Sequence, residues 1–539
     1  MCAGCRRLTV LVFTLGLFVL ASAAAAQPSV TITPTNVTLI VGEARQFTAI
    51  ASVAPTEVGA GGEYTCVRLS NGTEYCTGRN QFGQLGNGSL NNASVPVSVS
   101  GLASVAHLVP GDEFSCALIA DGTIQCWGTG EKGQRGDGTF TSWSASPAAV
   151  TGITTAVAAA AGYNHACALL GDGTMQCWGD NEHGQLGDSM AETASSLPVN
   201  VGGISSPLAI AVGGFHTCAL MADRTVRCWG RNGQGQVGDG TLDDAAAPVS
   251  VAGLSSVASL ALGGTHSCAA LADGTVQCWG NGYDGQLGNG TFDPSSTPVL
   301  VSGITNAVSV AAGWAHTCAL LQDGTVRCWG EGINGELGNG TATSSPTPVA
   351  VAGIGGATGI TAGWWHHSCA VTGRSVRCWG ANDWGQLGNG TQTGSASPVA
   401  MSAAGVTWSS DAPSVASIDA NGLAVALKAG VATITATDAV GATGTTTLTV
   451  VKPRFVLNVT KTGATKDLAT VTASSGAINC GSSCSDSYES DTVVTLTASP
   501  ATLLTGWTGC DSAVGATCVV TVQSARTVVA RFLDVPPLQ

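Results

Sequence analysis

Charged residues are scarce in this chain of 539 residues, and basic ones are the scarcer kind. Asp and Glu number 34 and Lys and Arg number 20, and together they make up 10% of the chain. Nucleic acids and anionic lipid surfaces attract proteins mainly through clustered Lys and Arg. A weakly charged, acidic chain is a poor candidate for either, and we expect no nucleic-acid partner.

Long apolar runs are absent beyond the N-terminus. Arg6 and Arg7 precede the run LTVLVFTLGLFVL and the small residues Ala24 to Ala26, a pattern typical of a secretory signal peptide over residues 1–26. No other stretch reaches the roughly 18 apolar residues that a membrane span requires. The sequence predicts a protein that is secreted or held at the cell surface, without membrane insertion after cleavage. Losing two arginines takes the net charge from −14 to about −16.

Common catalytic signatures are also absent. The chain contains no H-E-x-x-H pair, no serine nucleophile elbow and no phosphate-binding glycine loop. Its cysteines recur at gaps of nine residues rather than at the C-x2-C spacing of zinc sites. We therefore expect a non-enzymatic protein with no catalytic residues, no metal and no cofactor.

The abundant feature is a repeat, G-x-x-H-[ST]-C-A-L-x-x-D-G-T-V-x-C-W-G followed by G-Q-L-G-[ND]-G, at intervals of 50 or 51 residues. A repeat of this length, with strand and turn signals and no helical pattern, predicts an all-β fold with a closed β-propeller. Seven copies predict seven blades over residues 52–404. The first cysteines of the copies are Cys66, Cys116, Cys167, Cys218, Cys268, Cys318 and Cys369.

Paired cysteines in each copy predict disulfides, because an exported chain with an even number of cysteines favours them. In the sixth copy, counting outward from a three-residue Gly-containing turn places Cys318 opposite Cys328 on one hairpin. The seventh copy has a shorter turn at Gly373, yet the same count still places Cys369 opposite Cys378. The other pairs expected in this way are Cys66 with Cys76, Cys116 with Cys126, Cys167 with Cys177, Cys218 with Cys228 and Cys268 with Cys278. Arg224 replaces the turn glycine in the fourth copy, so that turn should be strained or different.

The residues that recur in each copy are interpreted as structural. A catalyst would not need one histidine per blade, so we expect the repeated histidines to pack or to link blades, and the repeated tryptophans to lie in the core. The histidines are His165, His216, His266, His316 and His367. The tryptophans are Trp127, Trp178, Trp229, Trp279, Trp329 and Trp379.

Gly, His, Asp-Gly, Trp-Gly and G-Q-L-G in this order resemble the regulator of chromosome condensation repeat over residues 52–404. That resemblance implies a seven-bladed propeller. The family includes nucleotide-exchange factors for a small GTPase and secreted bacterial proteins that bind, and in some cases inhibit, an enzyme through one propeller face. The paired cysteines depart from the usual repeat and fit an oxidising location.

Function is expected at the residues that differ between copies. Aromatic side chains stand at variable positions between the repeated Gly and His, and another precedes G-Q-L-G in the last copy. Aromatic residues dominate binding hot spots, whereas the alternative is that these rings merely fill gaps between blades. The candidate binding residues are Tyr163, Phe215, Trp314, Trp364, Trp365 and Trp384.

Two further domains flank the repeats. Residues 28–51 and 405–451 together resemble a bacterial Ig-like group 2 domain, through GEARQFTA, WSSDAPSVA and GVATITAT. The propeller is therefore expected to be inserted within this sandwich, since a closed ring brings its ends together. Residues 453–534 resemble a small β-rich repeat of the internalin B-repeat kind. Four cysteines there allow three pairings, and proximity favours Cys480 with Cys484 and Cys510 with Cys518.

Three functional hypotheses follow. The first is an extracellular, monomeric binding scaffold whose propeller face binds a protein partner, with inhibition of that partner as one version. The second is an adhesin-like protein whose exposed aromatic rings bind carbohydrate. The third, an exchange factor like the eukaryotic relatives, conflicts with the predicted signal peptide.

Overall fold

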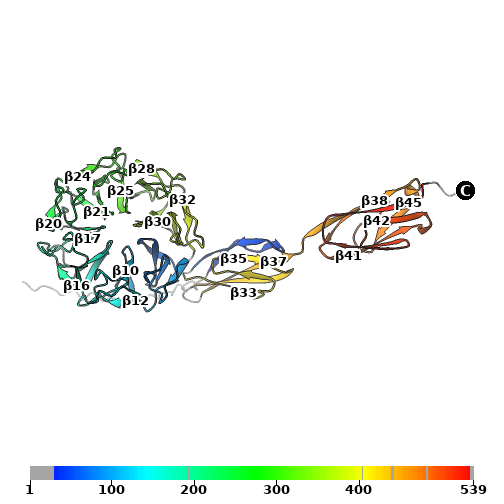
Figure 1. The fold of residues 1–539 in the computed structure, drawn as a ribbon, viewed down its shortest axis with the longest axis horizontal. Coiled ribbons are helices and arrows are strands. Elements are labelled where there is room, and N and C mark those ends of the chain that lie inside the picture. The colour runs from blue at the N-terminus through cyan, green and yellow to red at the C-terminus, as the bar shows by residue number, and fades with distance from the viewer. Residues whose placement is uncertain are drawn as a thin grey trace, which may run out of the picture.

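The structure, a computed structural model, describes residues 30–534 except residue 52 and segments 191–193, 403–404, 439–441 and 481–483. The predicted signal peptide lies outside these residues. Strands dominate the described part, and its only helical elements are two 3-10 turns, η1 (Lys466–Leu468) and η2 (Ala501–Leu503). Figure 1 shows a ring of blades followed by two elongated β domains in a row.

Seven four-stranded antiparallel sheets make the ring, and each is built from four consecutive strands. The first strands of neighbouring blades contact one another, so they surround the axis. These inner strands are β5 (Pro55–Ala60), β9 (Val105–Pro110), β13 (Ala156–Ala161), β17 (Ala209–Val212), β21 (Val257–Leu262), β25 (Ala307–Ala312) and β29 (Ala357–Ala362). The second strands are β6 (Tyr64–Leu69), β10 (Phe114–Ile119), β14 (His165–Leu170), β18 (His216–Leu220), β22 (His266–Leu271), β26 (His316–Leu321) and β30 (His367–Thr372).

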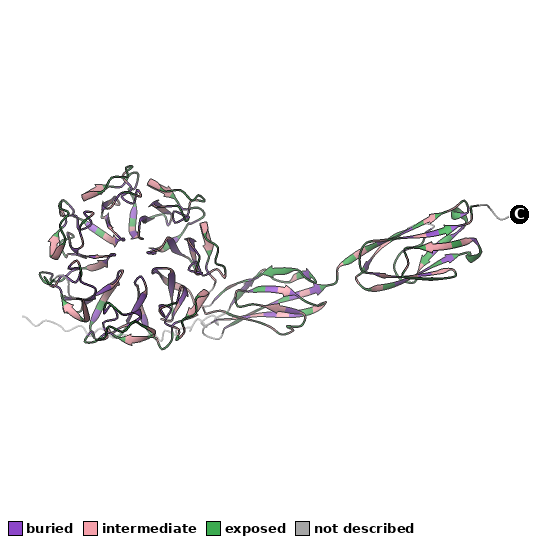
Figure 2. Ribbon diagram, in the orientation of Figure 1, coloured by how far each residue is buried: buried purple, intermediate pink, exposed green. Residues whose placement is uncertain are grey.

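The outer half of each blade is more exposed than the inner half (Figure 2). The third strands are β7 (Glu74–Gly78), β11 (Ile124–Thr129), β15 (Met175–Gly179), β19 (Val226–Gly230), β23 (Val276–Gly280), β27 (Val326–Gly330) and β31 (Ser375–Gly380). The fourth are β8 (Ala93–Ser98), β12 (Trp143–Ala149), β16 (Ser195–Asn200), β20 (Ala245–Ser250), β24 (Ser295–Leu300), β28 (Ser345–Ala350) and β32 (Ser395–Ala400).

Each blade carries one cross-strand disulfide between its second and third strands. Cys318 lies opposite Cys328, and Cys369 opposite Cys378 across the shorter turn. The other five blades join the pairs expected from the turn geometry. Arg224 keeps the turn of the other copies by adopting a φ of +66°, a left-handed conformation that is unfavourable for a residue with a Cβ.

Hydrogen bonds from the repeated residues link each blade to the next. The Thr217 hydroxyl donates to the Gln185 carbonyl at 2.9 Å, so Nε2 of His165, also 2.9 Å away, must donate to that hydroxyl. The same contact joins His216 to Ser267, His266 to Thr317, His316 to Ser368 and His367 to Thr65. The last of these joins blade 7 to blade 1. Among the described strands no sheet combines these two blades, so this contact and main-chain bonds such as Trp364 to Gly61 close the ring.

Burial lowers the pKa of these five histidines to about 3 or 4, which keeps the imidazoles neutral. The repeated tryptophans are fully buried, and each donates from its indole nitrogen to a main-chain carbonyl of the preceding blade. The recurrent His and Trp are therefore structural in this fold. Two junctions differ. Tyr64 replaces the histidine of blade 1, and its hydroxyl lies 2.7 Å from that of Ser115 in blade 2. Phe114 replaces the histidine of blade 2, and Ala166 replaces its hydroxyl partner in blade 3.

The Ig-like sandwich is assembled from both sides of the propeller. One sheet has the order β2 (Val37–Ile40), β37 (Thr443–Val451), β36 (Gly430–Thr437) and β33 (Thr407–Ser410). The other has the order β3 (Ala44–Gln46), β35 (Leu423–Ala426) and β34 (Ala416–Ile418). A separate pair joins β1 (Thr31–Thr33) to β4 (Thr48–Ile50). Phe47 and Ile434 are buried between these segments, so the propeller is inserted in the sandwich.

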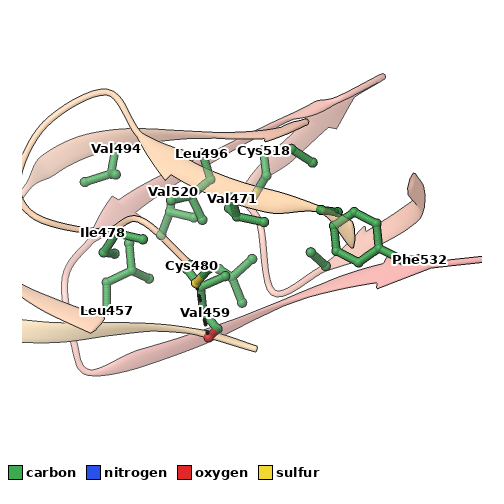
Figure 3. Packing of buried hydrophobic residues seen from close by; sticks show 14 of the residues in the cluster. Leu457, Val459, Val471, Ile478, Cys480, Val494, Leu496, Cys518, Val520 and Phe532 are labelled. Carbon is green, nitrogen blue, oxygen red and sulfur yellow. Dashed lines mark hydrogen bonds between the residues drawn. The ribbon is translucent and has the colours of Figure 1, made fainter. Parts of the chain in front are cut away.

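The C-terminal domain packs two four-stranded sheets against each other. The first has the order β40 (Ser485–Glu489), β38 (Arg454–Thr462), β45 (Arg526–Phe532) and β42 (Leu504–Thr508). The second has the order β39 (Thr470–Ala473), β41 (Thr492–Ser499), β44 (Thr517–Val522) and β43 (Ser512–Val514). Leu457, Leu496 and Phe532 are all buried in its core (Figure 3), and disulfides join Cys480 to Cys484 and Cys510 to Cys518. Its resemblance to the internalin B repeat stays a prediction.

Candidate functional site

One face of the propeller carries both sets of variable residues. Successive strands of a blade are antiparallel, so the loops after the first and third strands of every blade end on the same face. We call this the upper face. The loops after the second and fourth strands, which include the Asp-Gly turns, form the opposite face. The variable residues between the repeated Gly and His, and those that precede G-Q-L-G, therefore lie on the same face.

Aromatic rings from four different blades meet on the upper face. Tyr163 lies 5.4 Å from Phe215 and 6.1 Å from Trp314 between ring centroids. Trp314 stacks on Trp365 at 5.6 Å with an interplanar angle of 8°. Blades 3 and 6 are not neighbours in the ring, so Tyr163 and Trp314 meet across the opening of the axial channel. We call Tyr163, Phe215, Trp314 and Trp365 the mouth cluster.

The inner loops are shaped to hold these rings. A Cβ on Gly264 would lie 2.8 Å from the Trp314 ring, so glycine in blade 5 leaves the space that this indole occupies. The Trp365 indole donates to Oδ1 of Asp112 in blade 2 at 2.7 Å, and the Trp364 amide donates to Gly61 of blade 1. The loop of the last blade is thus tied to the first two blades.

Acidic groups surround the Asp112 end of the cluster. Burial, reinforced by the nearby Glu113 carboxylate, raises the pKa of Asp112 to about 7. Arg79 pairs with Glu63 at 2.8 Å and with Glu113 at 3.1 Å. Burial also raises the pKa of Tyr163, and the charge of Asp112 adds to that shift. The rings are therefore bordered by a hydrogen-bonding, negatively charged edge.

The six residues proposed from the sequence do not all reach this surface equally. The four rings of the mouth cluster are half-buried, with one side available. Trp384 is half-buried further out, where the Arg79 guanidinium lies 5.4 Å from its ring and 5.3 Å from that of Phe82. Trp364, next to Trp365, is only 6% exposed, so its assignment to the binding surface is corrected to a packing role.

The sequence interpretation missed exposed apolar residues at the outer edge of the upper face. Leu90, Phe140, Leu242 and Phe292 occupy equivalent positions after G-[ND]-G-[ST] in four blades, and all are exposed. Tyr283 and Ile333, in the loops after β23 and β27, are 63% and 61% exposed. The sequence did contain a signal for them: an apolar residue recurs directly after the polar turn G-[ND]-G-[ST]. Clustered exposed apolar side chains mark interaction surfaces.

The fold and this surface define a class: a disulfide-bonded seven-bladed propeller with an aromatic centre on one face. The family model of the RCC1-like domain matches residues 30–366, more than half of the chain. The chain therefore belongs to the RCC1-like domain family. A bacterial Ig-like domain of group 2 matches residues 389–450. These limits differ from the structure, in which residues 31–50 pair within the sandwich and the last blade runs to Ala400.

Known proteins share parts of this chain. The probable E3 ubiquitin-protein ligase HERC4 of Mus musculus is 38% identical over 85 residues, which cover 15% of this chain and 8% of that protein. The chain thus spans less than a tenth of this curated relative. Prp20p of Saccharomyces cerevisiae matches with a TM-score of 0.54 and 22% identity, over 70% of this chain and 94% of that one. Human WBSCR16 matches with a TM-score of 0.56 and 22% identity, over 61% and 94%. Identities this low establish the fold alone.

Among the described residues, no helix is long and apolar enough to cross a membrane.

Proposed function

We propose that this protein is an extracellular, non-enzymatic scaffold that binds a protein partner through the upper face of its propeller. The observation that carries the proposal is the mouth cluster, in which rings from four blades converge over the channel. Half-buried aromatic anchors surrounded by other contact residues are typical of binding hot spots. The exposed apolar residues at the outer edge extend the same surface.

The rest of the molecule suits a robust extracellular role. Nine disulfides and a bacterial Ig-like domain fit an extracellular protein. The two domains that follow the ring extend away from it in Figure 1, which leaves the propeller free to present a face. Related propellers also bind proteins: yeast RCC1 (Prp20) has been solved bound to Kap60.

Affinity capture followed by titration tests this proposal. The oxidised chain is immobilised and exposed to proteins and polysaccharides from its native surroundings, beside a variant with Tyr163, Phe215, Trp314 and Trp365 changed to serine. A matched control changes Val157, Leu208 and Val308, which are exposed on the opposite face, to serine. We expect a protein that binds the unmodified chain and the control alike. Its affinity for the mouth-cluster variant should fall at least about 30-fold, since hot-spot truncations cost about 2 kcal/mol or more.

Two results would contradict the proposal. Retention of a polysaccharide, lost only in the mouth-cluster variant, would identify the protein as an adhesin that stacks sugars on its aromatic rings. Equal retention of one partner by the mouth-cluster variant and the unmodified chain would exclude these residues as the binding surface.

A further inference from the structure

Blades 6 and 7 contain departures from the repeat that meet in space. Glu336 in blade 6 stands where the six other copies have glutamine. His366 is the additional residue of the inner loop in blade 7, between Trp365 and the repeated histidine. Glu331 directly follows β27 in blade 6. The six glutamines are Gln84, Gln134, Gln185, Gln236, Gln286 and Gln386.

These three side chains converge on one point of the upper face. Nδ1 of His366 lies 3.0 Å from Oε1 of Glu336 and 3.1 Å from Oε2 of Glu331. One ligand atom from each residue lies within 4.8 Å of the other two. The Glu336 side chain is completely buried, and those of Glu331 and His366 are 15% and 26% exposed. The group is therefore a largely buried cluster contributed by two blades rather than a solvated pair.

Without a metal, the alternative is an imidazolium paired with both carboxylates: Glu331 and Glu336 raise the pKa of His366 to about 10, and the Asn334 side-chain amide also donates to Oε1 of Glu336 at 2.9 Å. An imidazole nitrogen carries at most one proton and can donate it along one direction, whereas two carboxylate oxygens face this nitrogen at nearly equal distances. Within the described part of the chain, the buried Nδ1 of His366 has no partner with hydrogen-bond geometry. The backbone of His366 also has a φ of +61°, which is costly for a residue with a Cβ. Strain of this kind is concentrated at functional sites.

A divalent cation fits the donor set and its spacing. Ligand atoms bound at about 2.1 Å lie roughly 3.0 to 3.4 Å apart around one metal ion, depending on its geometry. The two measured spacings from His366 fall at the short end of this range. One imidazole and two carboxylates suit zinc, manganese or iron better than calcium or magnesium, which take oxygen ligands alone. Asp284 of blade 5 lies near this group: burial raises its pKa, the charge of Glu331 adds to that shift, and His366 opposes it.

We propose that Glu331, Glu336 and His366 form a binding site for a divalent transition-metal cation, with Zn²⁺ as its first probe. The cation would link the loops of blades 6 and 7. It would also hold the position of His366, which directly follows Trp365. Because Trp365 stacks on Trp314 at 5.6 Å, metal binding would also hold the mouth cluster in place. The site stands on its own geometry and does not depend on the proposed protein partner. It departs from the expectation, drawn from the missing H-E-x-x-H pair and from cysteine spacing, that the chain holds no metal.

Calorimetric titration tests the site directly. The untagged, oxidised full chain is freed of metal with a chelator and titrated with ZnCl₂ and, separately, MnCl₂. The test variant is E336Q, which restores the glutamine of the other six blades and should therefore fold. The matched control is E182Q, which removes an exposed carboxylate from an upper-face loop of blade 3. H366A provides a second test with a different ligand removed.

We expect one equivalent of Zn²⁺ to bind the unmodified chain and E182Q with the same affinity. E336Q and H366A should each bind at least about 100-fold more weakly, because each loses one of three protein ligands. Thermal unfolding of the unmodified chain should shift upward with Zn²⁺, and that of H366A should not. Absence of binding to the unmodified chain, or binding by E336Q and H366A as tight as that of the unmodified chain, would overturn the proposal and leave the three residues as a structural ion pair. If E336Q does not fold, the H366A result decides.

Discussion

Acid should destabilise the propeller steeply, because five histidines are buried in neutral form. Burial lowers the pKa of three of them to about 3 and of two to about 4. In the unfolded chain these residues titrate near about 6.5. Below that pH these histidines bind protons in the unfolded state but stay neutral in the folded state. The free energy of unfolding therefore falls as pH falls. Their contribution is complete above about pH 6.5 and is lost progressively down to the folded pKa.

The magnitude follows from proton counting. Going from neutral pH to pH 5, each of these histidines lowers the free energy of unfolding by about 2 kcal/mol. Two buried carboxyls act in the opposite direction. Burial raises the pKa of Asp112 to about 7 and holds that of Glu74 well above its usual value, so both are protonated when folded and ionised when unfolded. The net uptake on unfolding is about three protons between pH 5 and 6, which is a slope of about 4 kcal/mol per pH unit.

The test follows the tryptophan fluorescence of the oxidised chain in urea at pH 7, 6 and 5. A variant with H266F and T317A copies the Phe114 and Ala166 pair that the chain already uses between blades 2 and 3. It removes one titrating group while keeping an aromatic ring in place. We expect its slope to be smaller by about 1.4 kcal/mol per pH unit, the value for one proton. A slope unchanged in this variant, or stability that rises below pH 6, would refute the reasoning.

Three changes to single blades should alter stability in predictable directions, measured by urea unfolding of the oxidised chain. Replacing Cys318 and Cys328 with alanine removes a disulfide that closes a separation of 10 residues and should cost about 3 kcal/mol; no loss would mean that packing alone holds the hairpin. R224G relieves a φ of +66° and should stabilise the protein by about 1 kcal/mol, whereas a destabilisation would show that the long hydrogen bond from the Arg224 guanidinium to the Val257 carbonyl, at 3.4 Å, outweighs that strain. G288A places a Cβ 2.6 Å from the indole nitrogen of Trp329 and should destabilise by more than about 2 kcal/mol, whereas a neutral effect would contradict this close packing.

The blade could be predicted from the sequence because its determinants are local. Counting outward from the turn gave the opposition of Cys318 and Cys328, and the structure has that register. The split sandwich could also be recognised, because the motifs GEARQFTA, WSSDAPSVA and GVATITAT stand on the two sides of the propeller repeats. These features depend on a few residues close in sequence, or on a motif long enough to be recognised in two pieces.

The arrangement of the upper face could not be predicted, because it depends on contacts across the ring. Tyr163 and Trp314 are separated by two blades, and only the diameter of the channel brings their rings to 6.1 Å. Trp364 and Trp365 are neighbours in sequence, yet one is buried and the other faces the mouth. The directions in which the Trp364 and Trp365 side chains point depend on how their loop accommodates His366, whose backbone has a φ of +61°.

Differences between the repeats can still be sorted by whether a neighbouring blade compensates for them. Phe114 removes a hydrogen-bond donor and Ala166 removes its acceptor, so the junction loses a matched pair and stays apolar. Such a change is structural, because no buried polar group is left without a partner. Glu336 buries a carboxylate where glutamine already makes the same bond to the main chain, and His366 brings a nitrogen to it at 3.0 Å. Burying a charge is costly unless it is paired or coordinates a metal, and here His366, whose pKa the two carboxylates raise to about 10, supplies a partner that the repeat itself does not contain.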